Sequence, residues 1–248
     1  VTGLVGSEMC IRDRSLFSRQ RSVGLRAIEL DDDDVLVGTA VTDGSQDIML
    51  FSSEGKVVRF AESAVRAMGR TARGVRGIKL APGHRLISLV VPKEGSKILT
   101  VSENGYGKRS ETQEFPVKGR GTKGVIGMTM SERNGSLVGA EQVWDGDEMM
   151  LISHQGTAVR TRVEEVSVQG RNTQGVRVIK TRDGEALVSV SRIAEDDIDA
   201  ADPVSDLDQQ VSGGAPSYDT GIAPGDVADG SQARDTSDSS EGDGDPAE

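Results

Sequence analysis

Pairs of short apolar runs, each pair separated by a turn that contains glycine, recur along the chain at a nearly constant spacing. The clearest copy, IMLFSSEGKVVRF at residues 48–60, is typical of a β-hairpin around a Ser-Glu-Gly turn. Residues 97–110 (KILTVSENGYGKRS) and 149–161 (MMLISHQGTAVRT) repeat the pattern, the first with an Asn-Gly turn. The turn glycines, which are 50 and 51 residues apart, are Gly55, Gly105 and Gly156.

Each hairpin is followed by the same three features. A short linker, 61–67 in the clearest copy, has room for one helical turn, and a basic glycine-rich segment follows at 68–80. An apolar strand at 84–91 (HRLISLVV) then closes the unit after a Pro-Gly turn. The leucines of the closing strands, spaced by 50, 51 and 50 residues, are Leu36, Leu86, Leu137 and Leu187.

A period near 50 residues with about four strands per unit is typical of propeller-like blades. One such unit is too small to bury its own apolar face, so neighbouring units must pack together. We therefore predict an all-β, propeller-like repeat in which the chain begins inside a larger domain and forms a partial ring. The predicted units are a half blade at 15–46 and blades at 47–95, 96–146 and 147–194.

The two ends of the chain differ from the repeats. Residues 1–14 (VTGLVGSEMCIRDR) have no counterpart in the later units, and we interpret them as a non-native cloning or sequencing remnant or a disordered leader. Residues 195–248 are rich in Asp, Ser, Gly and Ala, with few large apolar groups. We predict a disordered tail because such a segment cannot bury enough surface to offset the entropy of ordering.

Charge is distributed unevenly between these regions. The net charge of the 248 residues is −11. Residues 195–248 hold 16 acidic and one basic residue, a net −15, while residues 1–194 hold 28 basic and 24 acidic residues, a net +4. A weakly basic body with a strongly acidic tail favours a nucleic-acid partner. No apolar run approaches the roughly 20 residues of a membrane span, and the single cysteine, Cys10, excludes a disulfide framework.

The basic segments recur with the period of the hairpins. MGRTARGVRGIKL at 68–80 has counterparts at 19–30, 119–130 and 170–181, and their cations fall at corresponding positions. In a radial fold these cations would form a positive stripe along the rim, which suits the backbone of a bent duplex. Glycines would let backbone N–H groups approach phosphates closely. The alternative is a solvated charged surface without a ligand.

Aromatic residues make up only 3% of the chain, which favours duplex contact over base stacking on single strands. The candidate DNA-binding residues are Arg21, Arg26, Arg59, Arg70, Arg73, Arg76, Lys79, Lys108, Arg109, Lys118, Arg120, Lys123, Arg160, Arg171, Arg177 and Lys180.

Catalytic and metal-binding patterns are weak. Gly119-x-Gly121-x-x-Gly124 matches a dinucleotide fingerprint, but the residues that follow are β-like, whereas the fingerprint requires a helix there. Tyr106 has no activating base or metal-binding carboxylates at a meaningful spacing, so we expect a structural or phosphate-contacting role. Asp31–Asp34 reads as a solvated turn, and two histidines leave little material for a zinc site.

Several of these segments resemble the C-terminal domain of the A subunit of bacterial DNA gyrase. They are MLFSSEGKVVRF, ESAVRAMG, GVRGIKL, ILTVSENGYGKR, TKGVIGM, SERNG and VQGRNTQGV, in this order between residues 16 and about 193. The resemblance implies a six-bladed β-pinwheel whose blades exchange strands and whose basic rim wraps duplex DNA. In that family, wrapping presents a crossed DNA segment to the breakage-reunion core, so that the ATP-dependent type II topoisomerase introduces negative supercoils.

The resemblance also implies what this chain does not carry. The family's basic heptapeptide box, its catalytic tyrosine with the neighbouring arginine, and the ATPase subunit have no match here. We therefore expect a non-catalytic part of an enzyme, with no cofactor of its own, since ATP and Mg²⁺ act in other domains. The implied partners are double-stranded DNA, the remainder of the gyrase A subunit and the gyrase B subunit in a heterotetramer, in the cytoplasm with the nucleoid.

Two alternatives stay open at this point. One is the C-terminal domain of the topoisomerase IV A subunit, which is usually shorter and more degenerate. The other is a propeller-type scaffold for protein interactions, whose acidic tail recruits basic partners.

Overall fold

The structure, a computed structural model, describes residues 2–5, 8–11, 14–19, 22–32 and 34–195. All described residues belong to one compact unit, within Val1–Pro203. The predicted disorder of the acidic tail concerns residues that, apart from Glu195, lie outside the described residues, so it stays a prediction.

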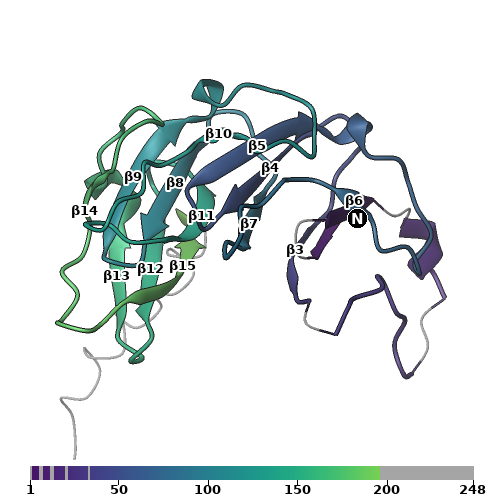
Figure 1. The fold of residues 1–248 in the computed structure, drawn as a ribbon, viewed down its shortest axis with the longest axis horizontal. Coiled ribbons are helices and arrows are strands. Elements are labelled where there is room, and N and C mark those ends of the chain that lie inside the picture. Colours follow the sequence, from purple (N-terminus) through teal and green to yellow (C-terminus); the bar gives the residue numbers. More distant parts are fainter. Residues whose placement is uncertain (1, 6–7, 12–13, 20–21, 33, 196–248) are drawn as a thin grey trace, which may run out of the picture. The chain divides into compact units, whose positions relative to one another are not determined.

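Three hairpins form where the apolar runs predict them (Figure 1). Each pairs two antiparallel strands: β4 (Asp47–Ser52) with β5 (Lys56–Ala61), β8 (Lys97–Ser102) with β9 (Tyr106–Glu111), and β12 (Glu148–Ser153) with β13 (Ala158–Arg162). The turn glycines Gly55, Gly105 and Gly156 have φ values of 75°, 78° and 84°, a region that glycine adopts at little cost.

The predicted closing strands add a third strand to the sheet of each hairpin. They are β7 (Leu86–Val90), β11 (Leu137–Val143) and β15 (Leu187–Ile193), each antiparallel to the first strand of its own hairpin. Short 3-10 helices follow the hairpins at Glu62–Ala64, Thr112–Glu114 and Val163–Glu165, the first of them inside the linker where a helical turn was predicted.

The fourth strand of a sheet comes from the basic segment of the following unit. β10 (Val125–Ile126) pairs with β5, and β14 (Val176–Arg177) pairs with β9. Strand orders are therefore β10-β5-β4-β7 and β11-β8-β9-β14, while the sheet β13-β12-β15 has three strands in the described part of the chain. This exchange confirms the pinwheel arrangement that the resemblance implied.

The first sheet includes part of residues 1–14. Strands β1 (Thr2–Val5) and β2 (Glu8–Ile11) form a hairpin between β3 (Leu36–Ala40) and β6 (Val75–Arg76), with the order β3-β1-β2-β6. We left this segment out of the prediction of the fold. The edges of β3 and β6 offer unpaired backbone groups, and a short β-capable segment can pair with them. Its non-native origin stays a prediction.

The apolar cores lie between successive units. One cluster combines Met49, Phe51 and Val57 from one unit with Ile98, Phe115, Met128 and Leu137 from the next. The rings of Phe51 and Phe115 meet edge to face, with centroids 6.4 Å apart. A second cluster joins Leu99 and Val101 to Met149, Leu151 and Leu187 in the same way. Each unit therefore depends on its neighbour for burial, as predicted.

Candidate nucleic-acid interface

The glycines of the basic segments serve the strand exchange. Gly124 and Gly175 have φ values of 75° and 77°. A Cβ on Gly124 would lie 2.3 Å from the carbonyl oxygen of Val57, and one on Gly175 would lie 2.6 Å from that of Gly107. Only glycine lets the segment lie this close to the preceding hairpin. We predicted that these glycines bring N–H groups to phosphates, but their structural task is this close contact.

One aligned series of arginines links consecutive basic segments. The guanidinium groups of Arg70, Arg120 and Arg171 donate to the backbone oxygens of Arg26, Arg76 and Ile126, at 3.3, 3.1 and 3.0 Å. Each acceptor occupies the same position in the preceding segment. These arginines therefore hold neighbouring segments in register.

A second series of arginines joins each hairpin to the next unit through hydrogen bonds. Arg59 bonds Asp47 at 2.8 Å and donates to the carbonyl oxygens of Thr112 and Phe115, at 2.8 and 3.2 Å. Its counterpart Arg109 donates in the same way to the oxygens of Val166 and Glu164 at 2.6 and 3.2 Å.

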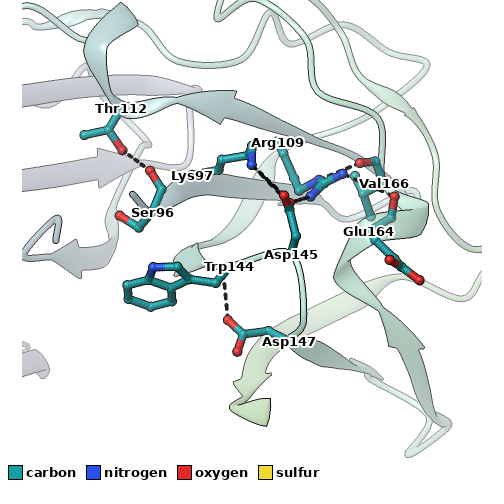
Figure 2. A network of polar contacts seen from close by, with 9 residues as sticks. All are labelled: Ser96, Lys97, Arg109, Thr112, Trp144, Asp145, Asp147, Glu164 and Val166. Carbon is teal, nitrogen blue, oxygen red and sulfur yellow. Dashed lines mark hydrogen bonds and ion pairs between the residues drawn. The ribbon is translucent and has the colours of Figure 1, made fainter. Parts of the chain in front are cut away.

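The carboxylate that pairs with the arginine comes from different positions in the two units: Arg59 pairs with Asp47, and Arg109 pairs with Asp145. Lys97 stands where the preceding unit has Asp47, and Asp145 supplies the missing negative charge. Figure 2 shows the Asp145 carboxylate between Lys97 and Arg109, with both of its oxygens 3.0 Å from the Lys97 ammonium nitrogen. The hydrogen bond from Lys97, together with Arg109, lowers the pKa of Asp145.

Lys108 is also engaged inside the fold. Its side chain is fully buried, and its ammonium group donates to the carbonyl oxygens of Gly170 and Arg171, both at 2.7 Å. Burial lowers the pKa of Lys108 from 10.5 to about 8. Arg59, Lys108 and Arg109 therefore hold units together; Lys108 and Arg109 are buried, and the Arg59 side chain is 18% exposed. Contact of these three residues with DNA stays a prediction.

Three lysines line one cavity of about 420 Å³ at the joint between two units. Lys56 lies in the hairpin strand that receives β10, and Lys79 and Lys123 come from successive basic segments. Glu54, Leu80, Ala81 and Pro82 complete the lining. Among the described residues, none of the three lysines has an acidic side chain within ion-pair distance. The cavity therefore offers three ammonium groups to an anion.

The next joint carries a different cationic group. Tyr106 occupies the position of Lys56, 50 residues later, between the guanidinium groups of Arg133 and Arg177. These lie 4.7 and 5.3 Å from the ring centroid, and an Arg177 N–H donates to the phenol oxygen at 2.8 Å. Hydrogen bonding by Arg133, then by Arg177, lowers the pKa of Tyr106. The sequence predicted Arg177 but missed Arg133 and Lys56.

The remaining predicted cations divide into exposed and paired side chains. Exposed cations that form no ion pair with another described residue are Arg26, Arg76, Lys118 and Lys180. Arg73 pairs with Asp31 at 2.5 Å and lies 3.9 Å from Glu29, and Arg160 pairs with Glu148. Arg21 lies outside the described residues.

The described part of the chain shows neither a metal cluster nor a membrane helix. Within it, no group of three or more His, Cys, Asp or Glu side chains could hold a metal ion. No helix in that part is both long and apolar enough to cross a membrane.

Sheets that exchange strands and share cores between repeats define a β-propeller-like repeat domain with a cationic surface at its joints. A family model described as "DNA gyrase C-terminal domain, beta-propeller" matches residues 14–43, 46–93, 96–143 and 147–194. The chain belongs to this family.

Relatives of the chain agree with this assignment. The DNA gyrase A subunit of Pseudomonas aeruginosa is 58% identical over 179 residues, which are 72% of this chain and 19% of the relative. The corresponding protein of Escherichia coli (strain K12) is 50% identical over 209 residues, covering 84% of this chain and 23% of the relative. The chain thus spans about a fifth of the length of these relatives.

Solved structures show the same fold. A DNA gyrase A C-terminal domain superposes with a TM-score of 0.69 and 29% identity, covering 78% of this chain and 65% of that one. The C-terminal domain of DNA topoisomerase IV gives a TM-score of 0.74 over 79% of this chain and 62% of that one. Its identity of 22% supports the shared fold alone.

Proposed function

We propose that this chain binds duplex DNA along the exposed cations of its basic segments and bends the duplex around its repeats. The observation that carries the proposal is the joint cavity, where Lys56, Lys79 and Lys123 present three ammonium groups without acidic partners among the described residues. Phosphates of a DNA backbone are suited to such a site because binding releases condensed counterions.

Further exposed cations extend this surface along the repeats. Arg26 and Arg76 hold corresponding positions in successive segments, and Lys79 and Lys180 hold corresponding positions two segments apart. Contacts repeated once per unit with few aromatic residues favour backbone binding over base readout. Sequence preference should therefore be weak.

Membership of the family suggests which enzyme this DNA-binding activity would serve. We propose that the chain acts as a non-catalytic part of the gyrase A subunit, with the rest of that subunit and the gyrase B subunit as its protein partners. Wrapping by this part would then serve negative supercoiling by the ATP-dependent enzyme, in the cytoplasm near the nucleoid. The acidic residues from 195 to 248, with a net charge of −15, would compete with DNA for the cationic surface.

Binding of a fluorescent duplex at a series of salt concentrations tests the proposal. The full chain and a variant ending before Glu195 should both bind, the shorter one more tightly. The logarithm of the affinity should fall linearly with the logarithm of salt concentration, with a slope near −0.9 for each phosphate contacted. Absence of duplex binding at low salt in the shorter variant would refute the proposal.

A pair of charge-matched variants separates DNA binding from a protein scaffold. Replacing Lys79 and Lys123 with glutamine should weaken binding and make the salt slope shallower by about 1 for each lysine. The control replaces Lys93 and Arg162, which are exposed and lie outside the basic segments, and should leave the slope unchanged. A scaffold with incidental charge would lose affinity equally in both variants.

A further inference from the structure

The joint that follows the lysine cavity keeps its positive charge although the three lysines are gone. The neutral residues at the corresponding positions, one unit later, are Tyr106, Thr129 and Gln174. Two arginines supply the charge instead: Arg133, in the turn at 132–134, and Arg177, which stands in β14 where β10 has Ile126. Both joints are therefore cationic, but different residues make them so.

The turn that carries Arg133 is held by hydrogen bonds from several sides. Asn134 is fully buried, and its Nδ2 donates to the backbone oxygens of Thr129 and Gln174 at 2.9 and 3.3 Å. The side-chain amide of Asn104 donates to the backbone oxygen of Arg133 itself at 3.2 Å. The turn is thus bound to two successive basic segments and to the tip of a hairpin, which sets the place from which Arg133 extends.

Arg177 meets Arg133 at the phenol of Tyr106. Arg177 lies opposite Tyr106 in the register of β14 and β9, and its Nη2 donates to the phenol oxygen at 2.8 Å. The guanidinium carbon of Arg133 lies 4.7 Å from the centroid of the same ring, and Arg133 also hydrogen-bonds the phenol. Tyr106 is 4% exposed, whereas both arginines are exposed. Two solvent-facing guanidinium groups therefore cover the ring and converge on one oxygen.

The group lacks a negative partner within the described part of the chain. Glu103 and Glu132 are close in sequence, but neither forms an ion pair with Arg133 or Arg177. Because both arginines donate to the phenol oxygen, the phenol hydrogen is left to donate elsewhere, and no described residue accepts it. Two like charges held at one oxygen repel each other. An anion that accepts from all three donors would remove this repulsion and satisfy the phenol hydrogen.

We propose that Arg133 and Arg177 together bind one phosphate group, with Tyr106 as the positioning residue that holds the two guanidinium groups side by side. Each planar guanidinium offers parallel N–H donors to an oxyanion, so a pair of them suits the several oxygens of a phosphate. We assign this phosphate to the backbone of duplex DNA, and the assignment rests on the proposed function. The chain would then hold DNA through separate lysines at one joint and through a shared arginine pair at the next.

Ionisation of Tyr106 gives a direct signal for a bound phosphate. The chain has two tyrosines, Tyr106 and Tyr218, so the difference in tyrosinate absorbance between the full chain and its Tyr106→Phe variant isolates the first. The probe is inorganic pyrophosphate at constant ionic strength, with chloride as the control anion. A bound phosphate opposes a phenolate beside it, so pyrophosphate should raise the pKa of Tyr106 by about one unit. In Arg133→Gln the pKa should start higher and respond little.

Binding of a fluorescent duplex to the full chain at a series of salt concentrations tests the source of the phosphate. Arg133→Gln and Arg177→Gln should each weaken binding about tenfold, which corresponds to the loss of one charge-assisted hydrogen bond. Since the two arginines share one phosphate, the double variant should make the salt slope shallower by about 1, whereas two separate contacts would remove about 2. Tyr106→Phe keeps the ring but removes the oxygen that holds the pair, so it should also weaken binding.

The matched control is Arg162→Gln, a change at an exposed arginine outside the basic segments, which should bind as wild type does. Circular dichroism verifies the fold of each variant. A pKa of Tyr106 that pyrophosphate does not move would overturn the phosphate site, because a tyrosine with a purely structural role behaves in that way. A double variant that binds duplex with the slope of wild type would overturn the assignment to DNA, and a slope change of about 2 would overturn the sharing. Absence of duplex binding in every form of the chain would refute the proposed function instead, and the pyrophosphate titration would then decide the phosphate site alone.

Discussion

Arg109 provides a direct test of how the repeats hold together. We expect Arg109→Met to destabilise the fold far more than Arg160→Met, although the two arginines occupy equivalent positions and each pairs with a carboxylate. Arg109 is nearly buried and also satisfies the carbonyl oxygens of Val166 and Glu164, whereas Arg160 has no carbonyl partner among the described residues.

The magnitude follows from those two carbonyls. Hydrogen bonds from a charged donor contribute about 1.5–3 kcal/mol each, so removing two should lower the free energy of unfolding by about 3–6 kcal/mol. The Asp145 carboxylate remains bonded to Lys97 and is 63% exposed, so its loss of Arg109 adds little. Arg160→Met removes a partly exposed ion pair and should lower the free energy by less than about 1 kcal/mol.

Urea denaturation of the full chain followed by far-UV circular dichroism measures both values. Trp144, the single tryptophan, lies next to Asp145 and gives a second probe by fluorescence. Coincident transitions with the two probes would justify a two-state treatment. Equal losses in the two variants would refute the clamp between units, because the change in side chain is the same at both sites.

Other predictions concern the buried side chain of Lys108 and the close backbone contact at Gly124. Since burial lowers the pKa of Lys108 from 10.5 to about 8, the unfolded chain binds more protons between these values. Wild type should therefore gain stability relative to Lys108→Met as pH rises from about 8 towards 10.5, by at most about 3.5 kcal/mol at 1.4 kcal/mol per pKa unit. Urea titrations of both proteins across this range check the sign, and a constant difference would contradict it. Gly124→Ala should cost more than about 2 kcal/mol, because backbone strain adds to a Cβ placed 2.3 Å from the Val57 oxygen. Gly83→Ala is the control: its φ of 77° is similar but no atom lies within 4 Å, so thermal unfolding should show a smaller loss of about 1 kcal/mol.

The repeat and its strands could be predicted because apolar alternation and turn glycines are local signals. The strand exchange could not be derived from them. Val125-Ile126 is a two-residue strand whose partner, Val57-Lys56, lies in the preceding unit, and nothing in its own sequence identifies that partner. Only the family resemblance implied it.

The same limit explains why the sequence did not show that two of the candidate site residues are buried. In an ordinary hairpin one of two successive residues faces solvent, but both Lys108 and Arg109 are buried. The next unit covers both faces of β9 and supplies carbonyl oxygens to each cation. Charge alone could not separate these internal clamps from Lys79 and Lys123, which line the open cavity.

The central claim is that the repeats bend duplex DNA around their cationic joints. Ligation of nicked circular DNA with saturating amounts of the chain lacking residues 195–248 tests it most directly, since wrapping is trapped as a change in linking number. We predict a shift of the topoisomer distribution that grows with protein concentration and is reduced by replacing Lys79 and Lys123, but not Lys93 and Arg162, with glutamine. A distribution that coincides with the protein-free control while the DNA is fully bound would contradict the account.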